Sequence, residues 1–289
     1  MSSNHPKRQH YVPQFLLRNF CDSEGYFWVG DTETGNVRKT KPGSNFVIND
    51  LYTEHALDPD TGDLTKKGYK YDKAIGKLES AAGTVVNEII EKARGKKCPE
   101  LSEKDSNTFK RFMLSIARRT PESQRRVKLS ESFKNLFYEA AKGRAEQQGY
   151  PLPDRNTLFQ DQQIVELMQK LQRNVDAKFA AGDDSHLIQD EENFCRETGL
   201  WVGVIGIPKR SFVIGSHGTT IFKMMNNKQS CLPIAHDVVV LASPNPELET
   251  FTILGQDEDW FIRKINTATA SQSRWIAGCS EQLIRSLMH

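Results

Sequence analysis

The feature that most constrains the fold is a change in the spacing of apolar residues along the chain. Between residues 72 and 182, apolar side chains recur at steps of three and four, the period of amphipathic helices. Before and after this stretch the apolar runs are short and often β-branched, which is typical of strands. We therefore expect a single α+β domain over residues 1–289. It would combine a central helical bundle with a small mixed or antiparallel sheet formed from the N- and C-terminal segments.

Residues 10–71 are expected to form an N-terminal plug followed by hairpins. Pro13 has the fixed φ of a first helical turn, so we expect a short helix to begin there. Four large apolar side chains, too many for one solvent-facing turn, follow it: Phe15, Leu16, Leu17 and Phe20. One hairpin should turn at Gly35. Residues 58–63 are predicted to form a second hairpin tip, because they fail the ligand pattern of a calcium loop.

The bundle is expected to contain four helices within residues 72–182. The second helix should begin after Ser102, a good N-cap, and the third should restart at Thr120-Pro121. Beyond the bundle, three short apolar runs predict buried strands within residues 200–289: 200–207, 211–214 and 238–241. A closing helix is then expected over about residues 258–277.

Charge and cysteine content bear on the class of protein. The chain has 39 basic and 37 acidic residues, so no global field favours nucleic acid or a membrane surface. No stretch approaches the roughly 18 apolar residues of a membrane span, and the first residues lack the apolar run of a signal peptide. The five cysteines are odd in number and far apart, as expected of reduced thiols. We therefore expect a cytoplasmic protein with no membrane contact.

Residues 10–20 read His-Tyr-Val-Pro-Gln-Phe-Leu-Leu-Arg-Asn-Phe. This string resembles the opening His-Tyr-Val-Pro-x-Phe-x-Leu-x-x-Phe pattern of an uncharacterised microbial family, the domain of unknown function four-two-three-eight. Shorter similarities include Arg119-Thr120-Pro121, a glutamate in the first long helix at Glu79, and an Ile-Asn pair at Asn266. The resemblance spans nearly the whole chain and implies relatives, but no activity.

Three candidate site residues lie in the plug and the first two long helices. His10 brings a titratable imidazole to a helix entrance, and Glu79 would place a carboxylate near the seam between bundle and sheet, as a base or a metal ligand. The alternative for Glu79 is a solvated helical face. Arg119 is the best candidate for holding a phosphate, because a guanidinium matches phosphate geometry. It belongs to a basic cluster: Arg118, Arg119, Arg125, Arg126 and Lys128. This cluster could contact nucleic acid or form a solvated or salt-bridged face.

Ser216 and His217 lie in a glycine-bounded turn after a predicted strand, where functional sites often gather. His217 is a candidate acid–base group and Ser216 a candidate substrate contact; the alternative is a tight connection with an exposed imidazole. The resemblance implies a Thr-Ser-Asp-Asn-Pro turn in relatives, so His217 replaces an aspartate. If that aspartate is catalytic in relatives, the replacement implies altered or lost activity.

Two further polar residues in the C-terminal third are weaker candidates. Asn266, in the closing helix, either binds substrate or clamps a neighbouring loop. His236 is adjacent to Asp237, but neighbouring strand residues point to opposite faces, which argues against direct pairing.

Two functions remain open. The first is a hydrolase acting on nucleic acid or another phosphate-containing substrate, such as a metal-dependent nuclease or phosphoesterase of a mobile-element or defence locus. A divalent metal is its candidate cofactor. The second is a non-catalytic binding or regulatory module. The sequence has no Gly-rich phosphate loop, Gly-x-Ser-x-Gly elbow or His-Glu-x-x-His motif. Convergence of three of the candidates His10, Glu79, Arg119, His217 and Asn266 in one pocket would favour the enzyme.

Overall fold

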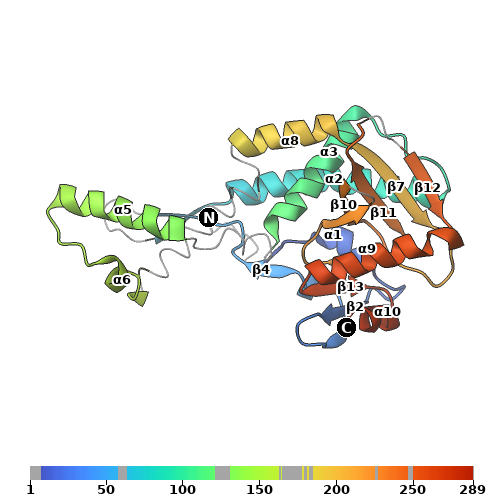
Figure 1. The fold of residues 1–289 in the computed structure, drawn as a ribbon, viewed down its shortest axis with the longest axis horizontal. Helices are drawn as coiled ribbons and strands as arrows, with labels where there is room; N and C mark the ends of the chain where they lie inside the picture. The colour runs from blue at the N-terminus through green and yellow to red at the C-terminus, as the bar shows by residue number, and fades with distance from the viewer. Residues whose placement is uncertain are drawn as a thin grey trace, which may run out of the picture.

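Two β-sheets and several long helices form the main body of the molecule (Figure 1). The computed structural model describes residues 8–57, 64–120, 131–162, 185–224, 227–246 and 250–288, and the single residues 164, 178 and 181. The α+β class expected from the sequence is confirmed. Two main sheets are present in the described ranges, where the sequence predicted one small sheet.

The larger sheet has five strands in the order β12-β7-β11-β10-β9. Their bounds are β7 Gly199–Ile205, β9 Thr220–Met224, β10 Asn227–Pro233, β11 Val238–Ser243 and β12 Thr250–Leu254. β12 pairs with β7 in parallel and the other pairs are antiparallel, so the sheet is mixed. Every residue of β11 is buried, as expected for a continuous apolar run in the middle of a covered sheet.

The second sheet joins N- and C-terminal segments in the order β3-β2-β13-β8. Its strands are β2 Phe27–Asp31, β3 Val37–Thr40, β8 Ile214–Gly215 and β13 Trp275–Gly278, all antiparallel. The hairpin of β2 and β3 turns at Gly35, whose φ of +74° favours glycine. Two smaller antiparallel pairs are β1 (Arg8–His10) with β4 (Val47–Asn49), and β5 (Glu54–Leu57) with β6 (Leu64–Gly68).

The short helix expected after Pro13 is present, and most of its apolar side chains are buried. Helix α1 (Gln14–Arg18) begins after Pro13, and the surrounding apolar side chains are buried: Tyr11, Val12, Leu16, Leu17 and Phe20. Phe15 stacks on Phe112 with ring centroids 5.6 Å apart. This packing against a central helix holds β1, and with it His10, at a fixed place on the body.

The first long helix ends and the second begins where the sequence predicted. Helix α2 (Lys70–Arg94) ends at Gly95, and α3 (Glu103–Arg119) packs against it. The Ser102 hydroxyl accepts a hydrogen bond from the Asp105 amide at 3.1 Å, so the expected N-cap is present. In the described ranges, no helix has both the length and the apolar character needed to cross a bilayer.

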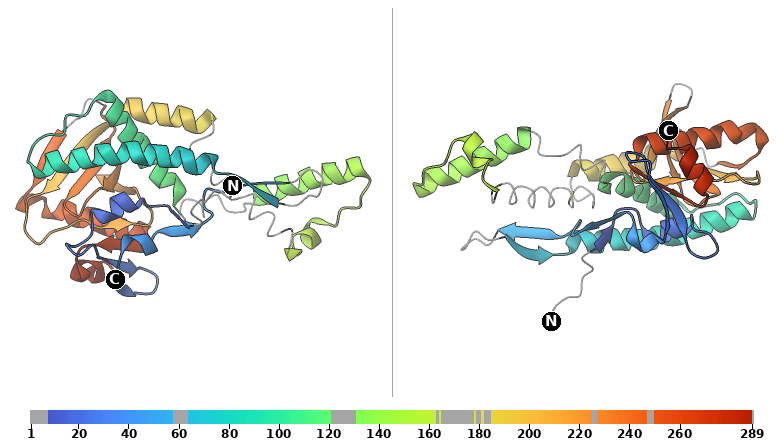
Figure 2. Two further views of the ribbon diagram at one scale, coloured as in Figure 1. Left: turned by 180° about the vertical axis from the view of Figure 1, so that it is seen from behind. Right: turned by 90° about the horizontal axis from the view of Figure 1, so that it is seen from below.

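The remaining helices are α5 (Glu131–Gln148), α6 (Arg155–Leu158), α8 (Ser185–Glu197), α9 (Asp259–Gln272) and α10 (Glu281–Ser286), with short 3₁₀ turns η1 (Pro42–Ser44) and η2 (Gln256–Glu258). Both α5 and α6 lie well away from α2 and α3 in every view (Figures 1 and 2). The described helices between residues 72 and 182 are therefore not one compact bundle. α8, which the sequence pattern did not predict, packs against α3.

The prediction of one closing helix over residues 258–277 is wrong at its end. Helix α9 stops at Gln272, Ser273 is extended, and residues 275–278 form β13 in the second sheet. Ile276 is fully buried in this strand, because both β2 and β8 pair with it. The hairpin tip at 58–63 and the restart at Pro121 lie outside the described residues, as does nearly all of the fourth predicted helix.

Candidate functional site

A cavity of about 270 Å³, here called the N-terminal pocket, lies between the plug and α2. Most of its lining is polar, including Gln9, His10, Gln14, Tyr52, Asp72 and Glu79. These residues come from β1, α1, the loop after β4, and α2. Polar side chains from four segments converging on one cavity are the arrangement expected of a binding or catalytic site.

Gln9 holds the pocket together. Its side-chain Nε2 donates to Asp72 Oδ1 at 3.0 Å, and its Oε1 accepts from the Tyr52 amide at 2.7 Å. Because Gln9 is buried, these hydrogen bonds replace those it would otherwise make to water. The strand that carries His10 is thereby fixed to both α2 and the loop after β4.

His10 presents a neutral imidazole to the pocket. Burial lowers its pKa, the Pro42 carbonyl opposes this shift, and the charge of Arg8 adds to it. Gln14 Oε1 accepts from Arg18, so its Nε2 is left to donate to His10 Nδ1 at 3.4 Å. This arrangement favours the tautomer with a lone pair on Nδ1, and that lone pair accepts the hydrogen bond from Gln14.

Arg119 lies behind the pocket. Its side chain is 0% exposed, and Nη1 donates to Glu79 Oε1 at 2.5 Å. Its Nε and Nη2 atoms are buried and make no hydrogen bond to the residues that the structure describes. Two nitrogen donors without such a partner on a buried cation are costly, and an anionic ligand would satisfy both.

Tyr52 also borders both the pocket and Arg119. The Tyr52 hydroxyl lies 3.4 Å from the His10 carbonyl oxygen, and the ring is buried. Burial raises the pKa of Tyr52 well above its ordinary value, although Arg119 opposes the shift. The hydroxyl therefore stays protonated at neutral pH.

The structure thus brings together three of the residues singled out in the sequence: His10, Glu79 and Arg119. His10 and Glu79 line the N-terminal pocket, and Arg119, which does not line it, pairs with Glu79 from behind. The sequence reading missed Gln9, Tyr52 and Asp72. Gln9 lies directly before the family string, and that position was the one available signal for it.

Ser216 and His217 do not line the N-terminal pocket. Ser216 is fully buried and its Oγ accepts from the Trp275 amide at 3.1 Å. The His217 amide donates to Ser273 Oγ at 3.1 Å, and its Nδ1 lies 2.9 Å from the Thr219 carbonyl. The alternative of an exposed imidazole is therefore wrong, because the ring is buried within the turn.

Asn266 bridges α9 to the segment before β8. Its Oδ1 accepts from the Val213 amide at 3.0 Å, and its Nδ2 donates to the Ser211 carbonyl at 2.9 Å. The residue is only 3% exposed. These are the contacts of a clamp on residues 211–213, and Asn266 does not line the N-terminal pocket.

The two described arginines of the basic cluster are internal. Arg118 is 9% exposed and its Nη1 lies 2.7 Å from Glu191 Oε1 on α8, while Arg119 pairs with Glu79. Neither side chain therefore belongs to a solvated basic face. Arg125, Arg126 and Lys128 lie outside the described residues.

His236 and Asp237 are in a turn rather than in a strand, so the expected opposite orientation does not apply. His236 Nε2 lies 4.0 Å from Asp237 Oδ1. The main partner of Asp237 is Arg94, whose Nε and Nη2 each donate to the carboxylate at 2.8 Å. This bidentate pair ties the end of α2 to the turn before β11.

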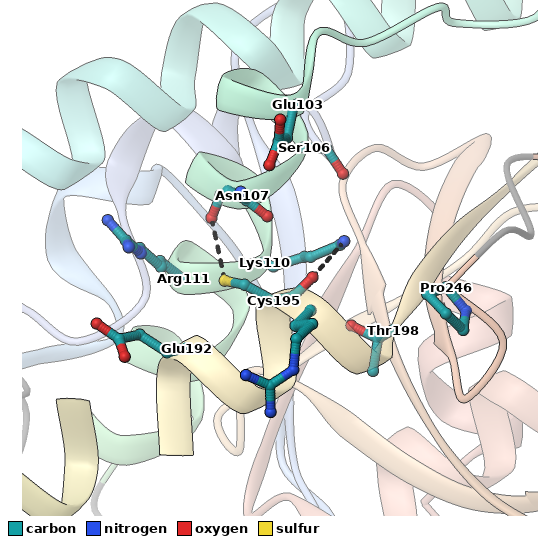
Figure 3. A pocket seen from close by; sticks show the side chains of 10 residues that line it. Glu103, Ser106, Asn107, Lys110, Arg111, Glu192, Cys195, Thr198 and Pro246 are labelled. Atoms are coloured by element: carbon teal, nitrogen blue, oxygen red, sulfur yellow. Dashed lines mark hydrogen bonds between the residues drawn. The ribbon is translucent and has the colours of Figure 1, made fainter. Parts of the chain in front are cut away.

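A larger cavity of about 500 Å³ lies between α3 and α8 (Figure 3). Lys110 Nζ donates to the Cys195 carbonyl at 2.9 Å, and Cys195 Sγ contacts the Asn107 carbonyl at 3.8 Å. Lys110 thus places its positive charge at the C-terminal end of α8, where the helix dipole favours it. Burial raises the pKa of Cys195, so its thiol is a poor nucleophile. The candidate residues from the sequence lie elsewhere.

Metal and disulfide chemistry can be judged from the side chains. Across the described ranges, no three His, Cys, Asp or Glu side chains form a group suited to a metal ion. All five cysteines are free thiols, as the sequence predicted.

Comparison with known proteins gives one match. The family model described as "Protein of unknown function (DUF4238)" matches residues 8–201, more than half of the chain. No curated protein and no solved structure matches the chain. The matched range includes the N-terminal pocket, α2 and α3, and it ends within β7. The chain therefore belongs to the DUF4238 family of proteins of unknown function.

Proposed function

We propose that the protein is a hydrolase that acts on a phosphate-containing substrate bound in the N-terminal pocket. The observation that carries this proposal is the convergence of His10, Glu79 and Arg119. A neutral imidazole can accept a proton from water, and a buried guanidinium with unpaired N–H groups can stabilise charge on phosphoryl oxygens.

Specific hydrogen bonds, rather than a net field, would hold the substrate. The four charged side chains at this site balance, with Arg8 and Arg119 opposed by Asp72 and Glu79. In the proposed reaction, the attacking water replaces Gln14 at His10 Nδ1 and gives its proton to that nitrogen as the water oxygen bonds to phosphorus. The P–O bond to the leaving alcohol breaks, the imidazolium returns the proton to that alcohol, and Arg119 Nε and Nη2 contact the phosphoryl oxygens. Glu79 holds the guanidinium in place for that contact.

The internal positions of Arg118 and Arg119 bear on the substrate class. Because both arginines are buried, they do not offer a surface to the backbone of a long nucleic acid. A small phosphate ester, or the end of an oligonucleotide, suits a cavity of about 270 Å³ better. The mobile-element or defence setting and the metal dependence stay predictions. We place the protein in the cytoplasm, where five free thiols are usual.

A non-catalytic binding module is the alternative, and the Gln9 network favours it. Gln9 satisfies Asp72 and the Tyr52 amide directly, as expected of polar groups that stabilise a core. Under this alternative the pocket binds a ligand but does not transform it.

The test is a hydrolysis assay on the purified chain. Substrates are 4-nitrophenyl phosphate, its bis ester, and end-labelled single- and double-stranded RNA and DNA, each with magnesium, manganese or chelator. The variants are His10→Asn and Glu79→Gln, with His236→Asn as the matched control because its imidazole lies outside the pocket. We expect hydrolysis to fall about 100-fold or more in folded His10→Asn and to persist in His236→Asn.

Two results would contradict this proposal, the first by removing the enzyme and the second by removing the role of His10. Turnover of no substrate, with saturable binding in the same samples, would establish the binding module. Hydrolysis that is equal in wild type and His10→Asn would remove His10 as the base.

A further inference from the structure

A second site lies between α9 and the five-stranded sheet, in an apolar cavity of about 220 Å³. Three aromatic rings line it: Trp201 on β7, and Trp260 and Phe261 on α9. We propose that this aromatic cavity binds a methylated ammonium group on a small organic cation. None of its lining residues lines the N-terminal pocket, so the inference is independent of the proposed hydrolase.

The three rings, here called the aromatic cage, pack against one another at steep angles. Trp201 and Phe261 have centroids 5.4 Å apart and planes at 87°, and Trp260 and Phe261 have centroids 5.7 Å apart and planes at 72°. Both indoles therefore stand steeply against the same phenyl ring. Aromatic rings that enclose a small volume attract a cation through their negative faces, and methylated ammonium groups are the ligands that use this best.

The cage is held in shape before any ligand binds. Trp201 Nε1 donates to Thr252 Oγ1 at 3.0 Å, which satisfies the polar atom of this indole and fixes its ring. Phe261 is buried in the core. A preformed site loses little side-chain freedom on binding, so even a small ligand can be held.

A carboxylate completes the site. Glu258 lines the cavity, and its Oε2 accepts from the Gly255 amide at 2.7 Å. The negative charge is thus fixed at the wall rather than on a mobile side chain. The rings alone would bind a cation only modestly more tightly than a neutral molecule of the same shape. The carboxylate increases this difference in affinity, because it attracts only the cation.

The volume of the aromatic cavity and its opening to solvent suit a small methylated ammonium group. Drug-sized ligands occupy roughly 300–1,000 Å³, and this cavity is smaller. Trp260 is 56% exposed, so one wall is open to solvent. Lys264 Nζ lies 5.9 Å from the centre of the Trp260 ring, which places a cation of the chain itself at this wall. Lys264 would repel an incoming cation.

The test compares choline with 3,3-dimethylbutan-1-ol, its neutral isostere, by calorimetry and tryptophan fluorescence on the full chain. The variants are Trp260→Ala, Glu258→Gln, which keeps an acceptor for the Gly255 amide, and Lys264→Gln. Ile253→Ala is the matched control, because Ile253 is an exposed apolar residue outside the lining. Free trimethyllysine is a separate arm that distinguishes a modified protein side chain from a small metabolite as the source of the group.

We expect choline to bind about ten-fold more tightly than the isostere. Trp260→Ala should weaken choline binding about ten-fold, and Glu258→Gln should weaken choline but not the isostere. Lys264→Gln should strengthen choline binding, and Ile253→Ala should leave it unchanged. Equal binding of choline and the isostere, no binding of choline or trimethyllysine, or full choline binding by Trp260→Ala would each overturn the proposal.

Discussion

Arg119, at the C-terminal end of α3, donates a hydrogen bond of 2.5 Å to Glu79 on α2. The two partners differ in burial: the Arg119 side chain is 0% exposed and that of Glu79 is 28% exposed. Removing Glu79 and removing Arg119 should therefore have different effects on stability, because the remaining charged side chain is hydrated in one case and buried in the other. A lone Glu79 can be hydrated from the pocket, whereas a lone Arg119 is a buried cation without a counter-ion.

The first prediction concerns this asymmetry. Glu79→Gln should destabilise the fold by about 3 kcal/mol, because it leaves the buried guanidinium uncompensated. Arg119→Met should cost less, because it removes the buried charge and keeps an apolar stem. Urea unfolding of both single variants and the double variant measures the two costs and their coupling. A larger cost for Arg119→Met would contradict this account.

The second prediction is a pH dependence of stability that His10 causes. Burial lowers the folded-state pKa of His10 from its ordinary value of 6.5. Below about pH 6.5 the unfolded chain therefore binds a proton that the folded chain does not, and stability falls until the pH reaches the folded-state pKa. His10→Asn should remove this part of the decline. Urea unfolding at several pH values between 7.5 and 5 tests it, and identical slopes in wild type and His10→Asn would disprove it.

The third prediction uses two glycines of the same backbone conformation. Gly35 and Gly218 have φ of +74° and +73°, but a Cβ at Gly35 meets nothing within 4 Å, whereas one at Gly218 would lie 2.1 Å from Ile116 Cγ2. Gly35→Ala should cost about 1 kcal/mol for its conformation alone. Gly218→Ala should cost about 3 kcal/mol, because the overlap with α3 adds to that. Thermal unfolding of the two variants side by side gives the difference, and equal costs would contradict the packing described.

The fourth prediction tests the Asn266 clamp. Asn266→Ala leaves the Val213 amide and the Ser211 carbonyl without their partner, so it should destabilise the protein by about 2 kcal/mol or more. Asn87→Ala, at an exposed position of α2, is the control and should change stability by less than about 0.5 kcal/mol. A similar small effect at both positions would show that the clamp does not matter.

Local signals allowed much of the fold to be predicted. Pro13, Ser102 and Gly95 mark the ends of helices in the structure because their effects act within one turn of backbone. Residues 275–278 were misread because their pairing partners, β2 and β8, lie far away in the sequence. A pattern of period 3.6 was continued across Ser273, where long-range strand pairing takes over.

In the candidate site, too, the sequence indicated what depends on single residues but not what depends on long-range contacts. The side chains of His10, Glu79 and Arg119 are types that often act in catalysis or binding, so the sequence alone made them candidates. Their convergence depends on the packing of the plug against α2 and α3, which the sequence does not show. Gln9 and Tyr52 carry no motif of their own, since their role is set by hydrogen bonds to segments more than forty residues apart. The aromatic cavity likewise joins Trp201 to Trp260 through tertiary contact alone.

The central claim is that Arg119 binds an anion in the N-terminal pocket, and its own side-chain resonance tests that most directly. In ¹⁵N-labelled protein, the Arg119 Nε–H signal, assigned by its loss in Arg119→Lys, is followed during titration with inorganic phosphate. The account predicts a saturable downfield proton shift, which His236→Asn retains, because Nε makes no hydrogen bond to the described part of the chain. An Arg119 signal that does not move while phosphate binds elsewhere, or does not bind, would contradict the account.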